Sequence, residues 1–131
     1  MEHVSARVAM RLITDATHSR EFGVECHYGP DDPYAVRLHF GAAAQDAVWV
    51  LSRELLLRGL RGPAGEGDVH IEPGADDSLF IALRGKDGIA LLEAPSAELA
   101  RFLTATEELV PTGREPSHLD WDSWLTDLLS A

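Results

Sequence analysis

The stretch Val48-Trp49-Val50-Leu51-Ser52-Arg53-Glu54-Leu55-Leu56-Leu57 passes without a break from an apolar run into a leucine-rich helical pattern. The apolar run over residues 47–51 is typical of a buried strand. Ser52 is a favourable N-cap, and Glu54 follows in the first turn, where the helix dipole favours a negative charge. Gly59 then predicts a left-handed C-cap that ends the helix. A strand therefore leads directly into a helix at this point.

A second junction of the same kind lies between Ala90 and Phe102. The apolar strand leads to Pro95, which suits the first position of a helix because its missing N–H would have no partner there. We expect the helix to run to residue 104, with Leu99, Phe102 and Leu103 on its apolar stripe. The two junctions form a weak internal repeat.

Alternating apolar and polar residues predict further strands before each junction. The expected strands are 4–14, 21–28, 34–40 and 47–51 in the first half, and 68–72, 78–83 and 88–92 in the second. Short turns rich in glycine, proline and aspartate separate them, which favours antiparallel pairing. The segment 59–67 contains four glycines and predicts a loop. The sequence therefore predicts an α+β fold, with two antiparallel strand blocks each followed by a helix.

The length of 131 residues predicts a single domain spanning 1–131. Within it we expect a first strand block and helix over 4–59, and a second over 67–104. Prolines and a glycine mark residues 105–119 as an extended linker. Asp120 is expected to cap a short C-terminal helix, which completes the segment 105–131.

Acidic residues outnumber basic ones by 22 to 11, and the net charge of −11 repels phosphate groups. Nucleic acid and anionic membranes are therefore disfavoured partners. The sequence has no apolar run long enough to cross a membrane, and charges at Glu2, Arg7 and Arg11 interrupt the N-terminal segment. These features predict a cytoplasmic protein without direct membrane insertion.

The sequence offers no strong catalytic or metal-binding motif. Cys26 alternates with apolar residues and is interpreted as a small buried side chain. The six histidines lack the spacing of a helix-borne zinc pair, so solvent-facing histidines are favoured over a metal site built from neighbouring strands. Asp31-Asp32 and Asp76-Asp77 lie in turns, where aspartate is favoured for backbone reasons. We expect no catalytic residue, no metal and no cofactor.

Four of the eleven basic residues are expected around the first helix: Arg37, Arg53, Arg58 and Arg61. The favoured interpretation is a solvated helix face. The alternative hypothesis is a docking patch for the acidic tail of a partner, because guanidinium groups bind carboxylates bidentately.

The C-terminal helix carries an apolar stripe of Trp121, Trp124, Leu125 and Leu128 at helical spacing. We expect this stripe to cover the core of its own domain, because apolar periodicity normally marks a core-facing side. The alternative is a contact with a partner or another subunit, where tryptophan is enriched.

Four segments occur in an informative order and spacing: Asp-Pro-Tyr-Ala-Val at 32–36, Gly-Glu-Gly-Asp-Val at 65–69, Ala-Leu-Leu-Glu-Ala-Pro at 90–95, and Trp-Leu-Thr-Asp-Leu-Leu at 124–129. With them the chain resembles, over about residues 4–129, the SsgA-like sporulation and cell-division proteins of filamentous actinomycetes. Departures in two expected loops, 41–46 and 74–78, leave the paralogue open.

The resemblance implies a cytoplasmic, non-enzymatic regulator that acts at the cell septum. Members of the family control septum placement during sporulation, and some help to recruit the division GTPase FtsZ together with an SsgA-type paralogue. The resemblance also implies a homo-oligomer, with a trimer as one candidate form. It gives no catalytic residue to transfer.

The family's fold is similar to that of Whirly-type domains, which bind single-stranded nucleic acid. A single-stranded nucleic-acid-binding protein is therefore the alternative function. Fold alone does not transfer that function, and the acidic charge and the scarcity of aromatic residues beside basic ones oppose it.

Overall fold

The structure is a computed structural model that describes residues 2–41, 47–86, 88–119 and 121–130, with only the backbone described at 121–124 and 127. The strands are β1 Val4–Ile13, β2 Ser19–Tyr28, β3 Ala35–Phe40, β4 Ala47–Ser52, β5 Ala64–Glu66, β6 Val69–Pro73, β7 Ser78–Gly85 and β8 Gly88–Pro95. The helices are α1 Arg53–Gly59, α2 Ser96–Leu109, the 3-10 helix η1 Glu115–His118, and α3 Trp121–Ser130. Within these residues, no helix is both long enough and apolar enough to cross a membrane.

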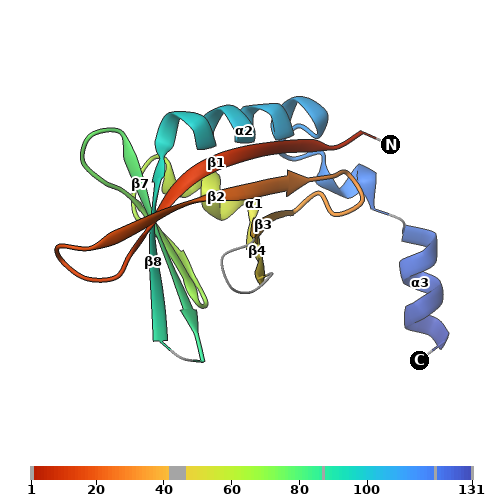
Figure 1. Cartoon of the computed structure of the whole chain (residues 1–131). Helices are drawn as coiled ribbons and strands as arrows, with labels where there is room; N and C mark the ends of the chain where they lie inside the picture. The colour runs from red at the N-terminus through yellow and green to blue at the C-terminus, as the bar shows by residue number, and fades with distance from the viewer. Residues whose placement is uncertain (1, 42–46, 87, 120, 131) are drawn as a thin grey trace.

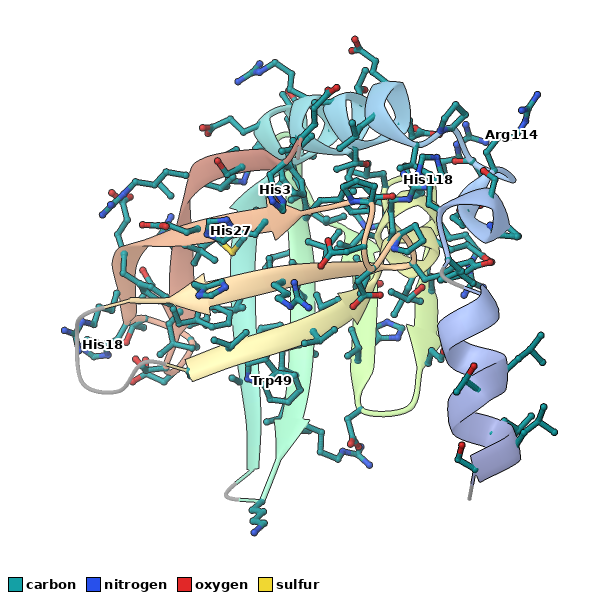
Figure 2. All side chains as sticks on the ribbon, turned by 90° about the vertical axis from the view of Figure 1, so that its right-hand side faces the viewer. His3, His18, His27, Trp49, Arg114 and His118 are labelled. Carbon is teal, nitrogen blue, oxygen red and sulfur yellow. The ribbon has the colours of Figure 1, made fainter. Side chains whose placement is uncertain are left out.

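The eight strands of the described residues form one sheet in the order β4-β3-β2-β1-β8-β7-β6-β5, and neighbouring strands are antiparallel. The strands of the first half cross those of the second at a steep angle (Figure 2). The two halves meet where residues 11–13 of β1 pair with residues 91–93 of β8. The predicted combination of antiparallel strands with few helices is confirmed.

The core lies on the face of the sheet that α1 and α2 cover, which we call the inner face; the opposite face is the outer face. Alternation along each strand sends apolar side chains inward, so Val8 and Met10 are buried whereas Arg7 and Arg11 are exposed. The register then aligns buried residues of adjacent strands, as Val8 does with Val24. Cys26 is completely buried, as predicted.

Helix α1 begins as predicted, because the Oγ of Ser52 accepts a 3.1 Å hydrogen bond from the backbone N–H of Leu55. Its end differs from the prediction. Gly59 belongs to the helix, and the cap residue Leu60 has right-handed backbone angles. A side chain at Gly59 would collide with Ile71 of β6, so glycine serves close helix-to-sheet packing here and not a left-handed turn.

Helix α2 begins at Ser96 and extends to Leu109, well past residue 104. Pro95 is the N-cap and not the first helical residue. The helix continues because Thr106 is buried against the core, and its hydroxyl is satisfied by the carbonyl of Leu103 at 2.6 Å. Because threonine is not an apolar residue, the apolar pattern in the sequence predicted a helix end that was too early.

The predicted loop 59–67 contains a short strand, β5, whose residues pair with β6. With three residues and a central glycine it gives no alternating pattern to detect. Gly67 follows it with φ of 60°, a conformation that favours glycine. Part of the predicted loop is thus a strand that ends in a tight turn.

Helix α3 projects beyond η1, away from the sheet (Figure 1). Three of its leucines are exposed: Leu125 at 45%, Leu128 at 58% and Leu129 at 82%. The prediction that this helix covers the core of its own domain is therefore wrong for Leu125 and Leu128. Asp120, the predicted cap, lies outside the described residues. Residues 42–46 of the expected loop 41–46 also lie outside them.

Candidate functional site

Arg53, the first residue of α1, has a buried guanidinium that joins three segments of the chain. Arg53 as a whole is only 1% exposed. Nη1 donates to the backbone carbonyls of Thr106 at 3.1 Å and Val110 at 2.8 Å, where α2 ends. Nη2 donates to a carboxylate oxygen of Glu115 in η1 at 2.9 Å. The helix that starts at Arg53 is thereby tied to the end of α2 and to η1.

The same guanidinium lies over an aromatic ring on the other side. Its central carbon is 4.9 Å from the centroid of Tyr28, a cation–π arrangement. The Tyr28 hydroxyl donates a 2.9 Å hydrogen bond to the carbonyl of Pro33, and the N–H of Arg53 donates to the carbonyl of Tyr34 at 2.8 Å. Burial raises the pKa of Tyr28 above its ordinary value, so the phenol keeps its proton.

Glu115 is the charge partner that makes the buried arginine tolerable. Burial alone acts to raise the pKa of Glu115, but hydrogen bonds from its own N–H, from Arg53 and from the N–H of Gly113 outweigh it. The pKa therefore lies below its usual value, and the carboxylate is ionised at neutral pH. Gly113 donates to the second carboxylate oxygen at 2.7 Å. This network fixes the path of the chain toward α3.

The predicted cluster of four arginines does not form. Arg53 is buried and bonded to Thr106, Val110 and Glu115, so it does not belong to an exposed docking patch. Arg37 lies on the outer face of β3 beside Asp32 at 3.6 Å. Arg58 lies on α1 between Glu54 at 3.6 Å and Glu66 at 3.9 Å.

The exposed remainder of the cluster is concentrated at the end of α1. Arg61 is exposed and has no ion pair among the residues that the structure describes. Its N–H donates to the carbonyl of Arg58 at 3.0 Å, which keeps the two residues in adjacent turns of the backbone. Arg58 and Arg61, and separately Arg37, stay candidates for contact with an acidic partner.

The apolar stripe of α3 is the second candidate surface. The side chains of Trp121 and Trp124 lie outside the described residues. Leu125 and Leu128, which complete the predicted stripe, are exposed, and Leu129 adds to them. Isolated exposed leucines are common, but three on one ten-residue helix that projects from the body form an apolar patch.

The thiol of Cys26 gives little support for nucleophilic chemistry. Burial raises the pKa of Cys26 to about 12, so it is protonated at neutral pH. Histidines do not converge on one site either: His18 and His118 lie at opposite sides of the molecule (Figure 2). The rings of His27 and His39 are 4.6 Å apart on the outer face. In the described ranges, no three His, Cys, Asp or Glu residues are placed to hold a metal ion.

Sequence reasoning missed the partners of Arg53. Tyr28, Thr106 and Glu115 carry no shared motif, and their separation along the chain hides the contact. The one available signal is an arginine at the start of a leucine-rich helix, directly after an apolar strand. Arginine is mostly exposed and is rarely buried without a paired group, so this position alone did not predict its burial.

Comparisons with known proteins agree over most of the chain. The family model described as Streptomyces sporulation and cell division protein, SsgA, matches residues 23–115. The sporulation-specific cell division protein SsgB of Kineococcus radiotolerans is 39% identical, and the alignment covers 97% of this chain and 80% of that protein. The protein of the same name from Streptomyces coelicolor is 38% identical, with 97% and 96% covered.

Solved structures show the same similarity in three dimensions. An SsgA-like sporulation-specific cell division protein from Thermobifida fusca superposes with a TM-score of 0.86 at 34% identity, covering 96% of this chain and 95% of that one. An SsgB structure, from work that correlates SsgB mutations with longitudinal cell division during sporulation of Streptomyces coelicolor, gives a TM-score of 0.85 at 37% identity. That superposition covers 89% of this chain and 95% of the other.

Proposed function

The chain belongs to the SsgA-like family of sporulation and cell-division proteins, and from this membership we propose that it regulates sporulation-specific cell division. In detail, it controls the selection of septum sites and helps to recruit the division GTPase FtsZ. It does so as a non-enzymatic protein that binds other proteins at the septum. The observation that carries the proposal is the similarity to SsgB proteins over 97% of the chain, supported by the shared fold.

The surface chemistry favours binding over catalysis. The thiol of Cys26 is buried, and the buried guanidinium of Arg53 is neutralised by its ion pair with Glu115. Exposed groups with binding potential lie instead on α3 and at the end of α1. We assign FtsZ, an SsgA-type paralogue and further copies of this chain as the partners, with a trimer as one form of the homo-oligomer.

A fluorescent fusion in sporulating cells tests the proposal directly. Produced in a Streptomyces coelicolor strain that lacks its own SsgB, the full-length fusion is expected to form regularly spaced bands at future septa and to restore septation. A diffuse signal together with unrestored septation contradicts the proposal. FtsZ imaged in the same cells reports recruitment: its bands are expected to coincide with those of the fusion.

Charge reversal tests the contribution of the exposed arginines. The triple variant Arg37→Glu, Arg58→Glu and Arg61→Glu leaves buried Arg53 intact, so the fold is expected to survive. Pull-down of FtsZ at low salt is expected to weaken if these residues meet an acidic partner. The matched control is Arg20→Glu, an exposed arginine on β2. Equal capture by the control and the triple variant removes these arginines from the binding surface.

Single-stranded nucleic-acid binding, the alternative, rests on the expected likeness to Whirly-type domains, which stays a prediction. The outer face does not strengthen it, because Arg7 and Arg11 of β1 alternate with the acidic Glu21, Glu25 and Glu93 of neighbouring strands. A gel-shift titration with single-stranded oligonucleotides at low salt decides the matter. Binding that weakens steeply with salt supports the alternative, and no shift excludes it.

A further inference from the structure

Strand β1 has a free edge over most of its length. On one side all ten of its residues pair with β2. On the other side only residues 11–13 pair with β8. Over Val4–Met10, no residue of the described chain forms backbone hydrogen bonds with this second side. A strand edge of this kind presents alternating N–H and C=O groups that can accept another strand.

The free edge arises because β8 turns away from β1. After Glu93, which pairs with Arg11, β8 stays beside β7 as far as Pro95 and the chain then enters α2. Pro95 has no N–H and could not extend a ladder with β1. Helix α2 then runs beside β1 toward the N-terminus (Figure 1). The space next to Val4–Val8 is therefore bordered by a helix instead of a strand.

A groove occupies this space. Its volume is about 300 Å³, and it is lined by the consecutive residues 4–8 of β1 together with Glu98, Arg101, Phe102 and Ala105 of α2. Consecutive lining residues mean that the groove follows the main chain of the strand. The α2 residues have the spacing i, i+3, i+4 and i+7, so a single face of the helix forms the opposite wall.

The charges beside the groove select its occupant. Arg101 is exposed on the helix wall and has no ion pair with any described residue. Arg7 also lacks an ion pair with any described residue, but its guanidinium lies by Gly23 of β2, on the side of β1 away from the groove. The one acidic residue in the lining, Glu98, lies in the first turn of α2, where the helix dipole stabilises it. The unpaired Arg101 on the helix wall, in a chain with a net charge of −11, favours an acidic ligand.

We propose that the groove between β1 and α2 binds an extended acidic segment of a partner protein as an added strand. The segment pairs antiparallel with the free edge of β1, in the direction of β8, and places a carboxylate against Arg101. Backbone hydrogen bonds supply affinity that depends little on sequence, whereas the arginine supplies the preference for an acidic side chain. The inference rests on the proposed function, because it gives a division protein a defined mode of partner binding.

The test uses the full chain and a fluorescein-labelled eight-residue peptide that alternates valine with glutamate. Fluorescence anisotropy at low salt is expected to show binding, and a matched peptide that alternates valine with lysine is expected to bind at least about tenfold more weakly. Arg101→Glu is expected to lower affinity for the acidic peptide by about tenfold. Ala105→Trp is expected to fill the groove and abolish binding.

Ala97→Trp is the matched control, because Ala97 is exposed on α2 and is absent from the groove lining. Circular dichroism and thermal unfolding establish that each variant is folded. Unchanged peptide affinity in both Arg101→Glu and Ala105→Trp overturns the proposal, as does the absence of binding by the acidic peptide. Equal loss in Ala97→Trp and Ala105→Trp also contradicts it, because the effect then does not come from the groove.

Hydrogen exchange provides a readout that distinguishes strand addition from a contact with side chains alone. Amides within residues 4–10 are expected to exchange more slowly when the peptide is added, whereas those of the remote edge strand β4 keep their rates. Binding without protection of β1 overturns the added strand. A chain that binds the peptide but never reaches septa supports the groove and contradicts the proposed function. A chain that restores septation but binds no acidic peptide supports the proposed function and contradicts the groove.

Discussion

The guanidinium of Arg53 and the carboxylate of Glu115 lie 2.9 Å apart, which joins the start of α1 to the 3-10 helix beyond α2. The arginine side chain is 1% exposed and that of the glutamate 12%. Two backbone carbonyls and the ring of Tyr28 complete the surroundings of Arg53.

Arg53→Met is expected to lower the free energy of unfolding by about 3 kcal/mol. The substitution keeps an apolar stem but leaves Glu115 and the carbonyls of Thr106 and Val110 without their donor. Urea denaturation followed by circular dichroism measures the change. Arg58→Met, on the exposed side of the same helix, is the control and is expected to cost less than about 0.5 kcal/mol. Similar losses in the two variants would show that burial of Arg53 is unimportant.

Glu115→Gln is expected to cost about 1 kcal/mol at pH 7, because an amide accepts from Arg53 without a charge. The pKa of Glu115 is lowered in the folded chain, so its contribution is present above the ordinary pKa of 4.5 and is lost as pH falls through the folded value. The stability difference between the two proteins should therefore shrink at acid pH. A difference that stays constant from pH 7 to pH 3 speaks against the ionised pair.

Tyr28→Phe is expected to lower the free energy of unfolding by about 1 kcal/mol. The ring still lies beneath Arg53, but the carbonyl of Pro33 loses its 2.9 Å hydrogen bond. Tyr34→Phe is the matched control, because Tyr34 is 48% exposed and its hydroxyl can reach water. Chemical denaturation of both variants decides, and the idea fails if Tyr34→Phe is the more harmful change.

Gly59→Ala is expected to destabilise the chain by about 1 to 3 kcal/mol. Alanine is intrinsically better in a helix than glycine, but here its methyl group would collide with Ile71. Gly62→Ala places a methyl group in open space at a residue without a positive φ and is expected to be neutral or slightly stabilising. Thermal unfolding compares the two. A stabilised Gly59→Ala variant would mean that α1 shifts away from β6 without penalty.

Leu125→Ser combined with Leu128→Ser is expected to leave the melting temperature nearly unchanged, because both leucines are exposed within the chain. Self-association or capture of division proteins is expected to weaken, since exposed leucines gain by burial against a partner. Sedimentation and pull-down measure the two effects. A marked loss of folding stability would instead assign α3 to the core of its own domain.

Much of the local structure could be predicted from the sequence. The strand at 47–51, the cap at Ser52 and the helix after it depend on neighbouring residues, and the structure places all three as expected. The C-terminal end of α1 was harder, because glycine serves both left-handed turns and close packing. Which of these applies at Gly59 depends on Ile71, which lies on another strand.

The candidate site could be predicted less well. Arg53, Arg58 and Arg61 look alike in the sequence, yet the first is buried and the others are exposed. The sequence also gave no reason to join Arg101 to the edge of β1. In both places the role of an arginine depends on what the neighbouring segments bring to it, and that is not written in the local pattern.

By itself, the sequence determined the antiparallel strands, the two strand-to-helix junctions, the acidic charge and the family, because period, caps and composition act between near neighbours. The tertiary structure decided which charges are buried and which strand edges stay open. Arg53 bonds to groups 53, 57 and 62 residues away, and the second edge of β1 has no strand partner over residues 4–10 in the described chain because β8 turns into α2. Contacts between residues so far apart along the chain form only when the whole sheet closes over its core, so no local sequence pattern can encode them.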